Sequence, residues 1–543
     1  MANLLKRVIL PKLLRKNPKP AHIFLFKRFA SDEENLKGII LGIFTDNCDF
    51  KFTKSATKFN SERGGKIDSI ISSNLDNLPP LGKASIFRNV DDEYNAVAVV
   101  GLGKEEVGVN TLEMLDECRE NIRIAAGIGA RMLYEVGITQ IIVESFGQSE
   151  AAAEGAALAI WKYDDHRDKE DRDPPAHLEL LYEEDKEGWE RGLFKAELQN
   201  FVRHICETPS NYMTPSVFAR LAEDFLCACP GINVDIRNDE YLHKNGLHAL
   251  LHIARSSEHK PVMLEIKYCG GKFEDRPFMI IGKGVTYDTG SLFLRKCKDM
   301  AEYKGDLAGG AIAIAAMRAI AVFQLPINVI CLVPLCENAI SGKSIRPGDV
   351  VFTCRHKTIQ IANPDHEGRV IMADVMDYGA KLEPRLLITI STQTSGVRAA
   401  LGASASGVFT NNFTLWQEAK KAGTVTGDRV WRLPLWKFFC EKLVDLMNAD
   451  ITNKGNEPSS GACFIKEFVP ACCEWIHFDI TAVALKCDGR EDTYYTEGLM
   501  TGRPTRTIVQ LLYQLSCPPE GKPVIEDPCP KQEPCAKTNK TDK

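Results

Sequence analysis

The sequence has no segment of 18 or more uncharged apolar residues, the length that a membrane-spanning helix requires. Its longest apolar stretch, residues 311–336, is interrupted by Arg318, Gln324 and Asn328, so we expect no membrane insertion. An excess of positive charge is also missing. The 543 residues carry a net charge of −6, which excludes a general attraction to nucleic acid.

Several common functional motifs are absent as well. The glycines at 101 and 103 resemble the start of a dinucleotide-binding loop, but the third glycine is replaced by Glu106. Residues 342–344 resemble the end of a phosphate-binding P-loop, but Glu337 stands where its first glycine should be. The chain also lacks a Gly-x-Ser-x-Gly elbow and a His-Glu-x-x-His helix.

The 18 cysteines include no Cys-x-x-Cys pair, which excludes zinc-ribbon and thioredoxin-type sites. The adjacent pair Cys472-Cys473 and the isolated Cys206, Cys331 and Cys463 lie in apolar segments, and we expect them to be small buried residues. In a reducing compartment they should remain thiols.

Residues 1–31 have no acidic side chain but contain eight Lys or Arg residues, so the rest of the chain carries −14. Their apolar residues can gather on one side of a short helix, which is typical of a mitochondrial transit peptide. The segment Arg28-Phe29-Ala30-Ser31 resembles a processing site. The alternative is a basic arm without regular structure, since prolines interrupt any long helix. We expect a mitochondrial matrix protein, with the cytoplasm as the alternative.

Short apolar runs alternate with helical patterns along most of the chain, which predicts an α/β fold. We expect a smaller N-terminal α/β domain over 38–195. A larger C-terminal domain over 196–515 should have a central mixed sheet flanked by helices. A dense run of charges at 163–170 separates the two patterns. Residues 516–543 are rich in Pro and Lys and are predicted to be disordered.

Three segments of the larger domain carry the residues of a candidate metal site. The first follows an apolar run and contains Lys283 and Asp288, the second contains Asp306, and the third contains Asp365 and Glu367. Taken singly, each has an ordinary structural explanation; Asp306, for example, could cap a helix. Together the four carboxylates balance two divalent cations, and Lys283 could join them as a neutral amine. Such ligands suit zinc, manganese or magnesium.

At these residues the chain resembles the leucine aminopeptidase family, the cytosol aminopeptidases. The family signature Asn-Thr-Asp-Ala-Glu-Gly-Arg-Leu corresponds to Asn363-Pro364-Asp365-His366-Glu367-Gly368-Arg369-Val370. Other similar stretches include residues 207–215, 346–349, 475–480 and 501–507. The resemblance covers 200–515 closely and 38–195 loosely, and it is greatest to the sperm paralogues of insects.

The resemblance implies a function and a set of site residues. It implies peptide substrates, a homo-hexamer, and two metal ions held by Lys283, Asp288, Asp306, Asp365 and Glu367. It also implies that Arg369 holds a bicarbonate and that Tyr303 and Thr392 line the substrate side-chain pocket.

The chain departs from the family pattern at several positions. Arg295 stands seven residues after Asp288, where the family has a lysine that polarises the substrate carbonyl. Arginine keeps the charge, but its planar fork does not replace an ammonium without loss. The loop 289–291 reads Thr-Gly-Ser in place of Ser-Gly-Gly, and the segment 392–396 is altered. His366 replaces a small residue, either as an extra ligand or as an outward-pointing loop histidine.

These residues are compatible with two functions. The first is a di-metal aminopeptidase with altered or reduced turnover, in which Arg295 and Arg369 are the catalytic candidates. The second is a catalytically impaired structural protein of sperm mitochondria, as for the insect testis members of the family. The intact ligand set favours retained metal in both.

We predict that residues 1–31 are removed on mitochondrial import, because of their eight cations and their lack of acids. N-terminal sequencing of the protein isolated from tissue should show a start near residues 30–32. A protein that begins intact at Met1 or Ala2 would contradict this prediction.

Overall fold

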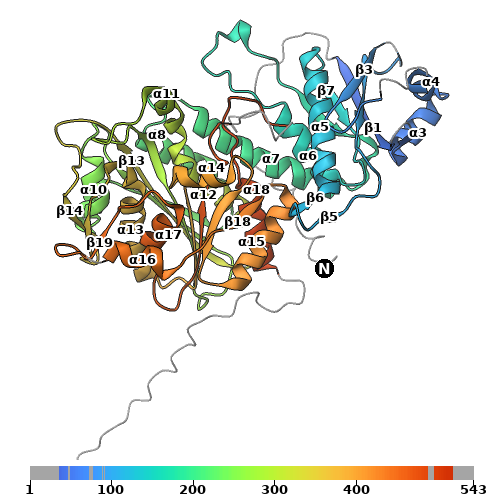
Figure 1. Ribbon diagram of the computed structural model, residues 1–543. Helices are drawn as coiled ribbons and strands as arrows, with labels where there is room; N and C mark the ends of the chain where they lie inside the picture. Colours follow the sequence, from blue (N-terminus) through green and yellow to red (C-terminus); the bar gives the residue numbers. More distant parts are fainter. Residues whose placement is uncertain are drawn as a thin grey trace, which may run out of the picture.

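The computed structural model describes residues 36–46, 49–72, 78–88, 90, 92–444, 446–486 and 494–517. The predicted transit peptide at 1–31 lies outside the described residues, as does the tail from 518 onwards. The described chain forms two lobes, which Figure 1 shows as a smaller blue-to-cyan part and a larger green-to-red part.

The smaller lobe is built on a six-stranded sheet in the order β3-β4-β1-β7-β8, with β2 paired to β1. Its central strands β1 (Lys37–Asp46), β4 (Ala96–Gly101) and β7 (Gln140–Val143) are parallel and confirm three predicted strands. Helices cover both faces, which explains the continuous apolar runs. The remaining elements are β2 (Asp49–Phe52), β3 (Ala84–Arg88), β8 (His177–Leu180), α3 (Lys54–Glu62), α4 (Lys66–Ser72), α5 (Glu117–Glu135) and α6 (Ser149–Ala159).

The larger lobe contains a nine-stranded mixed sheet in the order β18-β17-β20-β16-β11-β13-β10-β9, with β12 paired to β13. This confirms the predicted central mixed sheet. Its parallel core consists of β20 (Glu474–Asp479), β16 (Leu386–Ser391), β11 (Phe278–Gly282) and β13 (Asn328–Asn338). The other strands are β9 (Ile232–Arg237), β10 (Val262–Cys269), β12 (Gly284–Asp288), β17 (Ser406–Thr410) and β18 (Val430–Arg432).

Helices pack on both faces of this sheet (Figure 1). One face is covered by α7 (Lys186–Glu207), α8 (Pro215–Leu226), α12 (Ala308–Val322), α15 (Phe413–Thr426) and α18 (Thr505–Ser516). The other is covered by α10 (His248–Ala254), α13 (Glu367–Gly379) and α17 (Pro458–Lys466). The predicted domain boundary at 195/196 falls inside α7, which contacts both α6 and α12.

Helix α12 packs unusually close to the sheet because its first turn is rich in glycine. A Cβ on Gly309 would lie 2.3 Å from the Ile390 carbonyl oxygen of β16, and one on Gly282 would lie 2.3 Å from the Gly309 oxygen. The segment 301–322 is long and apolar enough to cross a membrane by composition. However, 89% of its most apolar window is buried inside the protein, as expected of a core helix.

Cys463 is buried as predicted, but the prediction that it remains a thiol is wrong, because it pairs with Cys440 in a disulfide that joins α16 (Lys437–Val444) to α17. The sequence spacing of 23 residues gave no signal of this pair. Cys206, Cys331 and Cys473 are free and buried, as predicted. Cys472 is exposed, against the prediction, because it lies in the turn that precedes β20.

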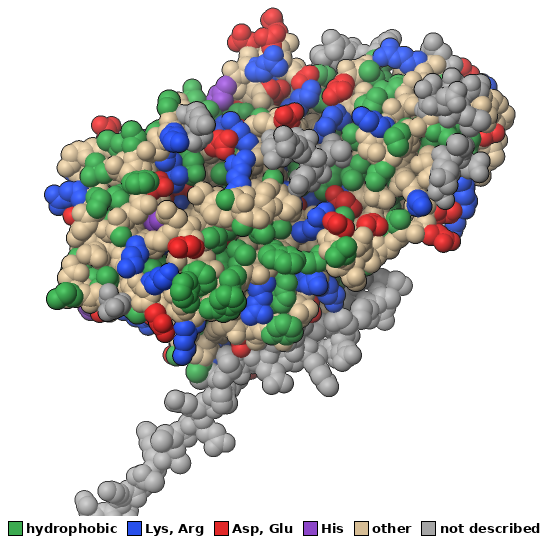
Figure 2. All heavy atoms as spheres, viewed as in Figure 1, with side chains coloured by type: hydrophobic (Ala, Val, Ile, Leu, Met, Phe, Trp, Pro, Cys, Tyr) green, Lys and Arg blue, Asp and Glu red, His purple; other side chains and the backbone are tan. Residues whose placement is uncertain are grey.

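A group of exposed aromatic side chains, which we call the aromatic patch, lies around α15, β18 and α16. It consists of Phe413, Trp431, Trp436 and Phe438, each more than half exposed. Figure 2 shows hydrophobic side chains gathered on this lower face of the larger lobe. Exposed aromatic side chains gathered on one face are typical of an interaction site.

Candidate metal centre

The five predicted ligands lie at strand ends and helix starts on one edge of the larger sheet. Lys283 is the single residue between β11 and β12, and Asp288 is the last residue of β12. Asp306 precedes α12 in a 3₁₀ segment, Ala301–Leu307, and Glu367 begins α13. Asp365 lies in a 3₁₀ turn, Pro364–His366, just before Glu367. Because α12 packs so close to the sheet, Asp306 is brought directly to Lys283.

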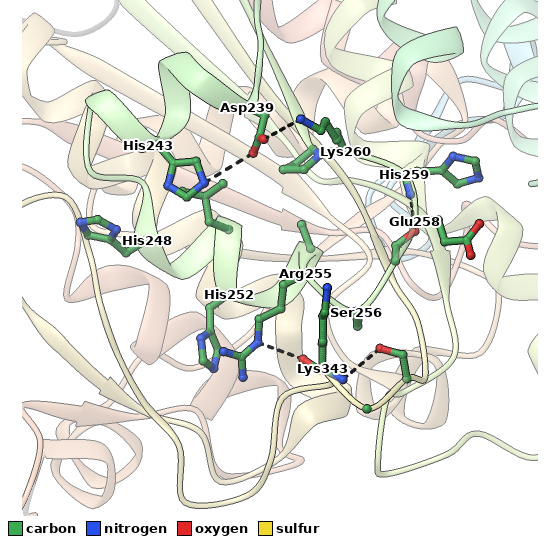
Figure 3. Close-up of a pocket in the computed structure, with 16 residues that line it drawn as sticks. Asp239, His243, His248, His252, Arg255, Ser256, Glu258, His259, Lys260 and Lys343 are labelled. Atoms are coloured by element: carbon green, nitrogen blue, oxygen red, sulfur yellow. Dashed lines mark hydrogen bonds and ion pairs between the residues drawn. The ribbon is translucent and has the colours of Figure 1, made fainter.

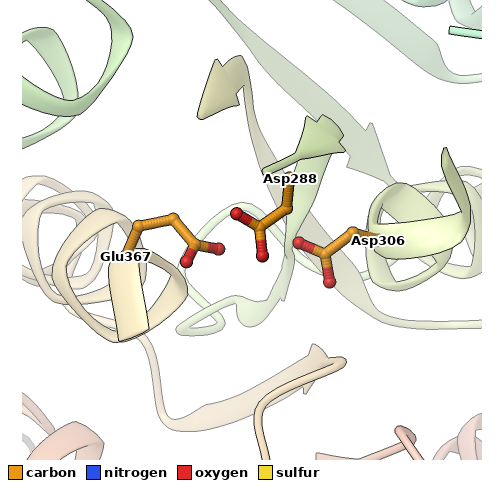
Figure 4. Close-up of side chains that lie close together, drawn as sticks. All are labelled: Asp288, Asp306 and Glu367. Atoms are coloured by element: carbon orange, nitrogen blue, oxygen red, sulfur yellow. The ribbon is translucent and has the colours of Figure 1, made fainter. Parts of the chain in front are cut away.

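The structure brings the ligand residues into one buried cluster. Carboxylate oxygens of Asp288, Asp306 and Glu367 all lie within 4.8 Å of one another (Figure 4), and each residue is at most 1% exposed. Lys283 Nζ lies 2.7 Å from Asp306 Oδ2 and 2.8 Å from Glu367 Oε1. Asp365 joins the cluster through Arg295, whose Nη2 lies 2.9 Å from Asp365 Oδ1.

Several of these buried oxygens are suited to a metal ion. Asp306 Oδ2, Asp365 Oδ1 and both Glu367 oxygens accept no hydrogen bond from any described residue. Three of these oxygens are met by a protein cation, since Lys283 Nζ pairs with Asp306 Oδ2 and Glu367 Oε1 and Arg295 Nη2 pairs with Asp365 Oδ1. Glu367 Oε2 has no ion-pair partner among the described residues. A buried carboxylate oxygen without a donor is costly unless a cation binds it. The donor set of carboxylates and one amine fits a zinc, manganese or magnesium ion.

Burial and mutual repulsion make this cluster unfavourable without metal. Burial, and secondarily the nearby Asp288, raise the pKa of Glu367 to about 8. Burial also raises the pKa of Asp365 and of Asp306. Burial alone would lower the pKa of Lys283, but Asp306 and Glu367 outweigh it and hold that pKa above its usual value. The amine must therefore release a proton before it can bind a metal.

Arg295 lies inside the cluster, and the adjacent Lys296 is exposed. Its Nε donates to Asp288 Oδ2 at 2.9 Å, and its Nη2 makes a shorter contact with the same oxygen. The guanidinium carbon lies 3.5 Å from the centroid of the Tyr303 ring. Arg295 is thus an ion-pair partner of two predicted ligands, an arrangement that sequence spacing could not indicate.

Arg369 is fully buried beside the cluster. Its Nη1 donates to the carbonyl oxygens of Asn453 and Lys454, both at 2.9 Å, and its Nη2 donates to Gly455 O at 2.7 Å. Its Nε has no acceptor among the described residues. Burial is the main reason that its pKa is lowered to about 10. Most of this guanidinium therefore fixes the 453–455 loop.

The predicted pocket residues line a small cavity at the cluster. Thr392 donates a hydrogen bond to Asp306, and Tyr303 lies under Arg295. The cavity has a volume of about 50 Å³. Ligand pockets typically measure about 300–1,000 Å³, so this space admits a few water molecules but no peptide.

The altered loop 289–291 carries strain at Ser291. Its φ of 53° lies in the left-handed region, where the family has glycine and where a side chain costs about 1–2 kcal/mol. Its hydroxyl is fully buried and has no partner among the described residues.

His366 fits neither of the two roles expected for it. It is partly buried rather than outward-pointing, and its Nδ1 lies 3.0 Å from Asn453 O. It is not part of the carboxylate group that could hold a metal ion among the described residues. Its pKa is lowered to about 3, mainly by burial, so the ring is neutral.

Asn338, the last residue of β13, belongs to the site but was not predicted from the sequence. It is fully buried, and its Nδ2 donates to Asp288 Oδ1 at 2.8 Å. Gly290 N also donates to this oxygen, at 2.9 Å. These two bonds orient the Asp288 carboxylate. An asparagine at a strand end beside predicted ligands was the only available signal.

A much larger cavity, of about 1060 Å³, lies elsewhere on the larger lobe (Figure 3). It contains four histidines, but their rings lie apart (Figure 3). Asp239 pairs with Lys260 at 3.2 Å, and His252 lies 3.2 Å from Asp349. We therefore place the chemistry at the carboxylate cluster, where buried groups converge, rather than in this open hollow.

Two family models match the chain. "Cytosol aminopeptidase family, catalytic domain" matches residues 200–509, and "Cytosol aminopeptidase family, N-terminal domain" matches residues 40–170. The cytosol aminopeptidase of Bos taurus is 38% identical over 491 residues, which are 88% of this chain and 93% of that protein. That of Dictyostelium discoideum is 31% identical over 524 residues, covering 93% and 99%.

The fold of the chain is also similar to that of a solved structure. The bottromycin maturation enzyme BotP in complex with Mn matches with a TM-score of 0.74 at 26% identity. The match covers 89% of this chain and 100% of that chain.

The raised pKa of Glu367 predicts opposite pH effects with and without metal. A carboxyl group whose pKa is raised in the folded state favours the folded protein as long as the group stays protonated. This contribution to stability is complete below the unfolded pKa near 4.5, and it is lost as pH rises through about 8. Metal-free protein should therefore lose stability between pH 6 and pH 8. The Mn²⁺-induced rise in melting temperature should grow over the same range, because deprotonated ligands bind better.

Glu367→Gln should melt at a higher temperature than wild type at pH 8 without metal, and it should lose most of the Mn²⁺-induced rise. Differential scanning fluorimetry at both pH values measures this, with the exposed Glu223→Gln as the control. If Mn²⁺ raised the melting temperature of Glu367→Gln as much as that of wild type, Glu367 would not be a ligand.

Proposed function

The chain belongs to the cytosol aminopeptidase family and is a metallo-aminopeptidase, and we propose that it removes N-terminal residues from peptides at a reduced rate. The observation that carries this proposal is the convergence of four carboxylates on Lys283 and Arg295, three of them fully buried, with Glu367 Oε2 left without a partner among the described residues. The residues that would hold metal are Lys283, Asp288, Asp306, Asp365 and Glu367. Bound divalent metal would supply an activated water and stabilise the oxyanion that forms at the substrate.

The other residues of the site orient the carboxylates and can polarise the substrate carbonyl. Asn338 holds Asp288 in place, and Thr392 holds Asp306 through hydrogen bonds to their carboxylates. Arg295 supplies a positive charge at the cavity, which can polarise a substrate carbonyl. Arg369 fixes the 453–455 loop, and its remaining Nε is the donor that we propose for a bicarbonate.

Three features support reduced turnover. The Arg295 guanidinium is engaged with Asp288 and Asp365 rather than free to meet a substrate. The cavity of about 50 Å³ is too small for a peptide until Arg295 or Tyr303 moves. Ser291 adds strain in the loop that carries Arg295. A catalytic group displaced by even 1 Å can lose about 10²-fold in rate.

The same features favour a second candidate, a catalytically impaired structural protein of sperm mitochondria. In this case the metal centre would stabilise the fold while hydrolysing little. The two candidates differ in one measurable property, the rate of cleavage of aminoacyl amides by fully metal-loaded protein.

We also propose that the protein acts in the mitochondrial matrix as a homo-hexamer. The basic, acid-free segment 1–31 supports the location. The aromatic patch supports assembly, since monomers rarely expose such a surface. Light scattering of metal-loaded protein should give the mass of six chains, and a monomeric mass would contradict the assembly.

Arg295→Lys should raise kcat/KM for aminoacyl amides by about ten-fold or more, equivalent to about 1.4 kcal/mol of transition-state stabilisation. A lysine can turn its single ammonium towards the substrate, whereas the arginine fork is held by two carboxylates. Lys296→Arg, at the adjacent exposed position, is the control and should leave the rate unchanged.

Two results would contradict the reduced-rate proposal. If the wild-type protein cleaves aminoacyl amides rapidly and Arg295→Lys does not raise that rate, the arginine is an adequate substitute for lysine. Metal-loaded protein that stays inert in both forms would favour the structural candidate.

A further inference from the structure

We propose that the Arg295 guanidinium takes the place of one of the two metal ions, so that the chain holds a single divalent ion tightly. This inference rests on the proposed function, because it concerns the metal centre of the same site. It follows from how the four carboxylates are divided between two protein cations.

The carboxylates form two pairs, each with its own positive group. Asp306 and Glu367 lie 2.7 and 2.8 Å from Lys283 Nζ. Asp288 and Asp365 both contact Arg295 Nη2, which lies 2.9 Å from Asp365 Oδ1 and closer to Asp288 Oδ2.

A metal ion bridging Asp288 and Asp365 would need the space that Nη2 fills. Metal ions such as zinc bind carboxylate oxygens at about 2.0–2.2 Å, and Nη2 already lies between the two oxygens at contact distance. A divalent ion placed beside the guanidinium would also be repelled by its charge. A second metal ion therefore binds only after the guanidinium has left.

Other contacts keep the guanidinium in place. Its Nε donates a further hydrogen bond to Asp288 Oδ2 at 2.9 Å, and its plane lies against the Tyr303 ring. The Arg295 backbone N–H donates to Thr289 O at 2.9 Å, which anchors the residue in the loop. The side chain is only 17% exposed, and arginine does not lose its proton. A lysine at this position could make neither the planar fork nor the same stacking.

The other metal position remains available. Both Glu367 oxygens and Asp306 Oδ2 lack a hydrogen-bond donor among the described residues, and Asp288 lies within 4.8 Å of them. Lys283 is the only cation that contacts these oxygens within the described chain, and its Nζ lies 2.7 Å from Asp306 Oδ2 and 2.8 Å from Glu367 Oε1. Unlike the Arg295 guanidinium, this amine can itself become a ligand of the ion once it has released its proton. One ion can therefore bind there without moving Arg295.

The test is equilibrium dialysis of the full-length protein against Mn²⁺ at graded concentrations, followed by elemental analysis. Wild type should bind one Mn²⁺ per chain, with a second only at a concentration on the order of a hundred-fold higher. Arg295→Met keeps most of the side-chain volume without charge and should bind two ions of similar affinity. Lys296→Met removes a neighbouring exposed charge and should bind as wild type does.

Wild type that binds two Mn²⁺ ions as tightly as Arg295→Met would overturn the inference. If Arg295→Met does not fold, the same dialysis is made with Arg295→Lys. Tight binding of a second Mn²⁺ ion by Arg295→Lys would support the inference, and binding of only one ion, as in wild type, would overturn it. Activity is a separate readout. Variants that bind two ions but cleave no aminoacyl amide would refute the proposed aminopeptidase function and leave the metal-replacement inference intact.

Discussion

Four neighbouring carboxylates, three of them fully buried, must be balanced by positive charge, and the rest of the site depends on this constraint. Two protein cations, Lys283 and Arg295, each meet one pair of them. Glu367 Oε2 has no partner among the described residues, and Lys283 could bind a metal ion beside it as a neutral amine. The centre is therefore poised between an ion-pair network formed by the protein alone and a metal site.

The fold brings these charged groups together at one place. Glycines 282 and 309 allow α12 to approach the sheet so closely that any side chain there would overlap backbone atoms. Gly368 plays a similar role, since a Cβ on it would lie 2.8 Å from Lys283 Nζ. The small residues around the cluster thus follow from the need to bury a lysine among carboxylates.

The sequence predicted the strands, and it predicted the segments whose proposed ligand residues lie together, because both have short-range signals. Apolar runs marked β1, β11 and β16, and turn residues after them marked the ligand segments. The pairing of Arg295 with Asp288 and Asp365 was not predictable, because it depends on the path of the loop between them. The disulfide between Cys440 and Cys463 likewise depends on how α16 and α17 pack.

We infer that the Arg295 guanidinium fills the space that a second metal ion would need between Asp288 and Asp365. Anomalous scattering at the manganese edge from crystals grown with Mn²⁺ would test this claim most directly. The account predicts one strong peak beside Asp306 and Glu367, with guanidinium density between Asp288 and Asp365. A second peak of equal height between Asp288 and Asp365, with Arg295 turned away, would contradict it.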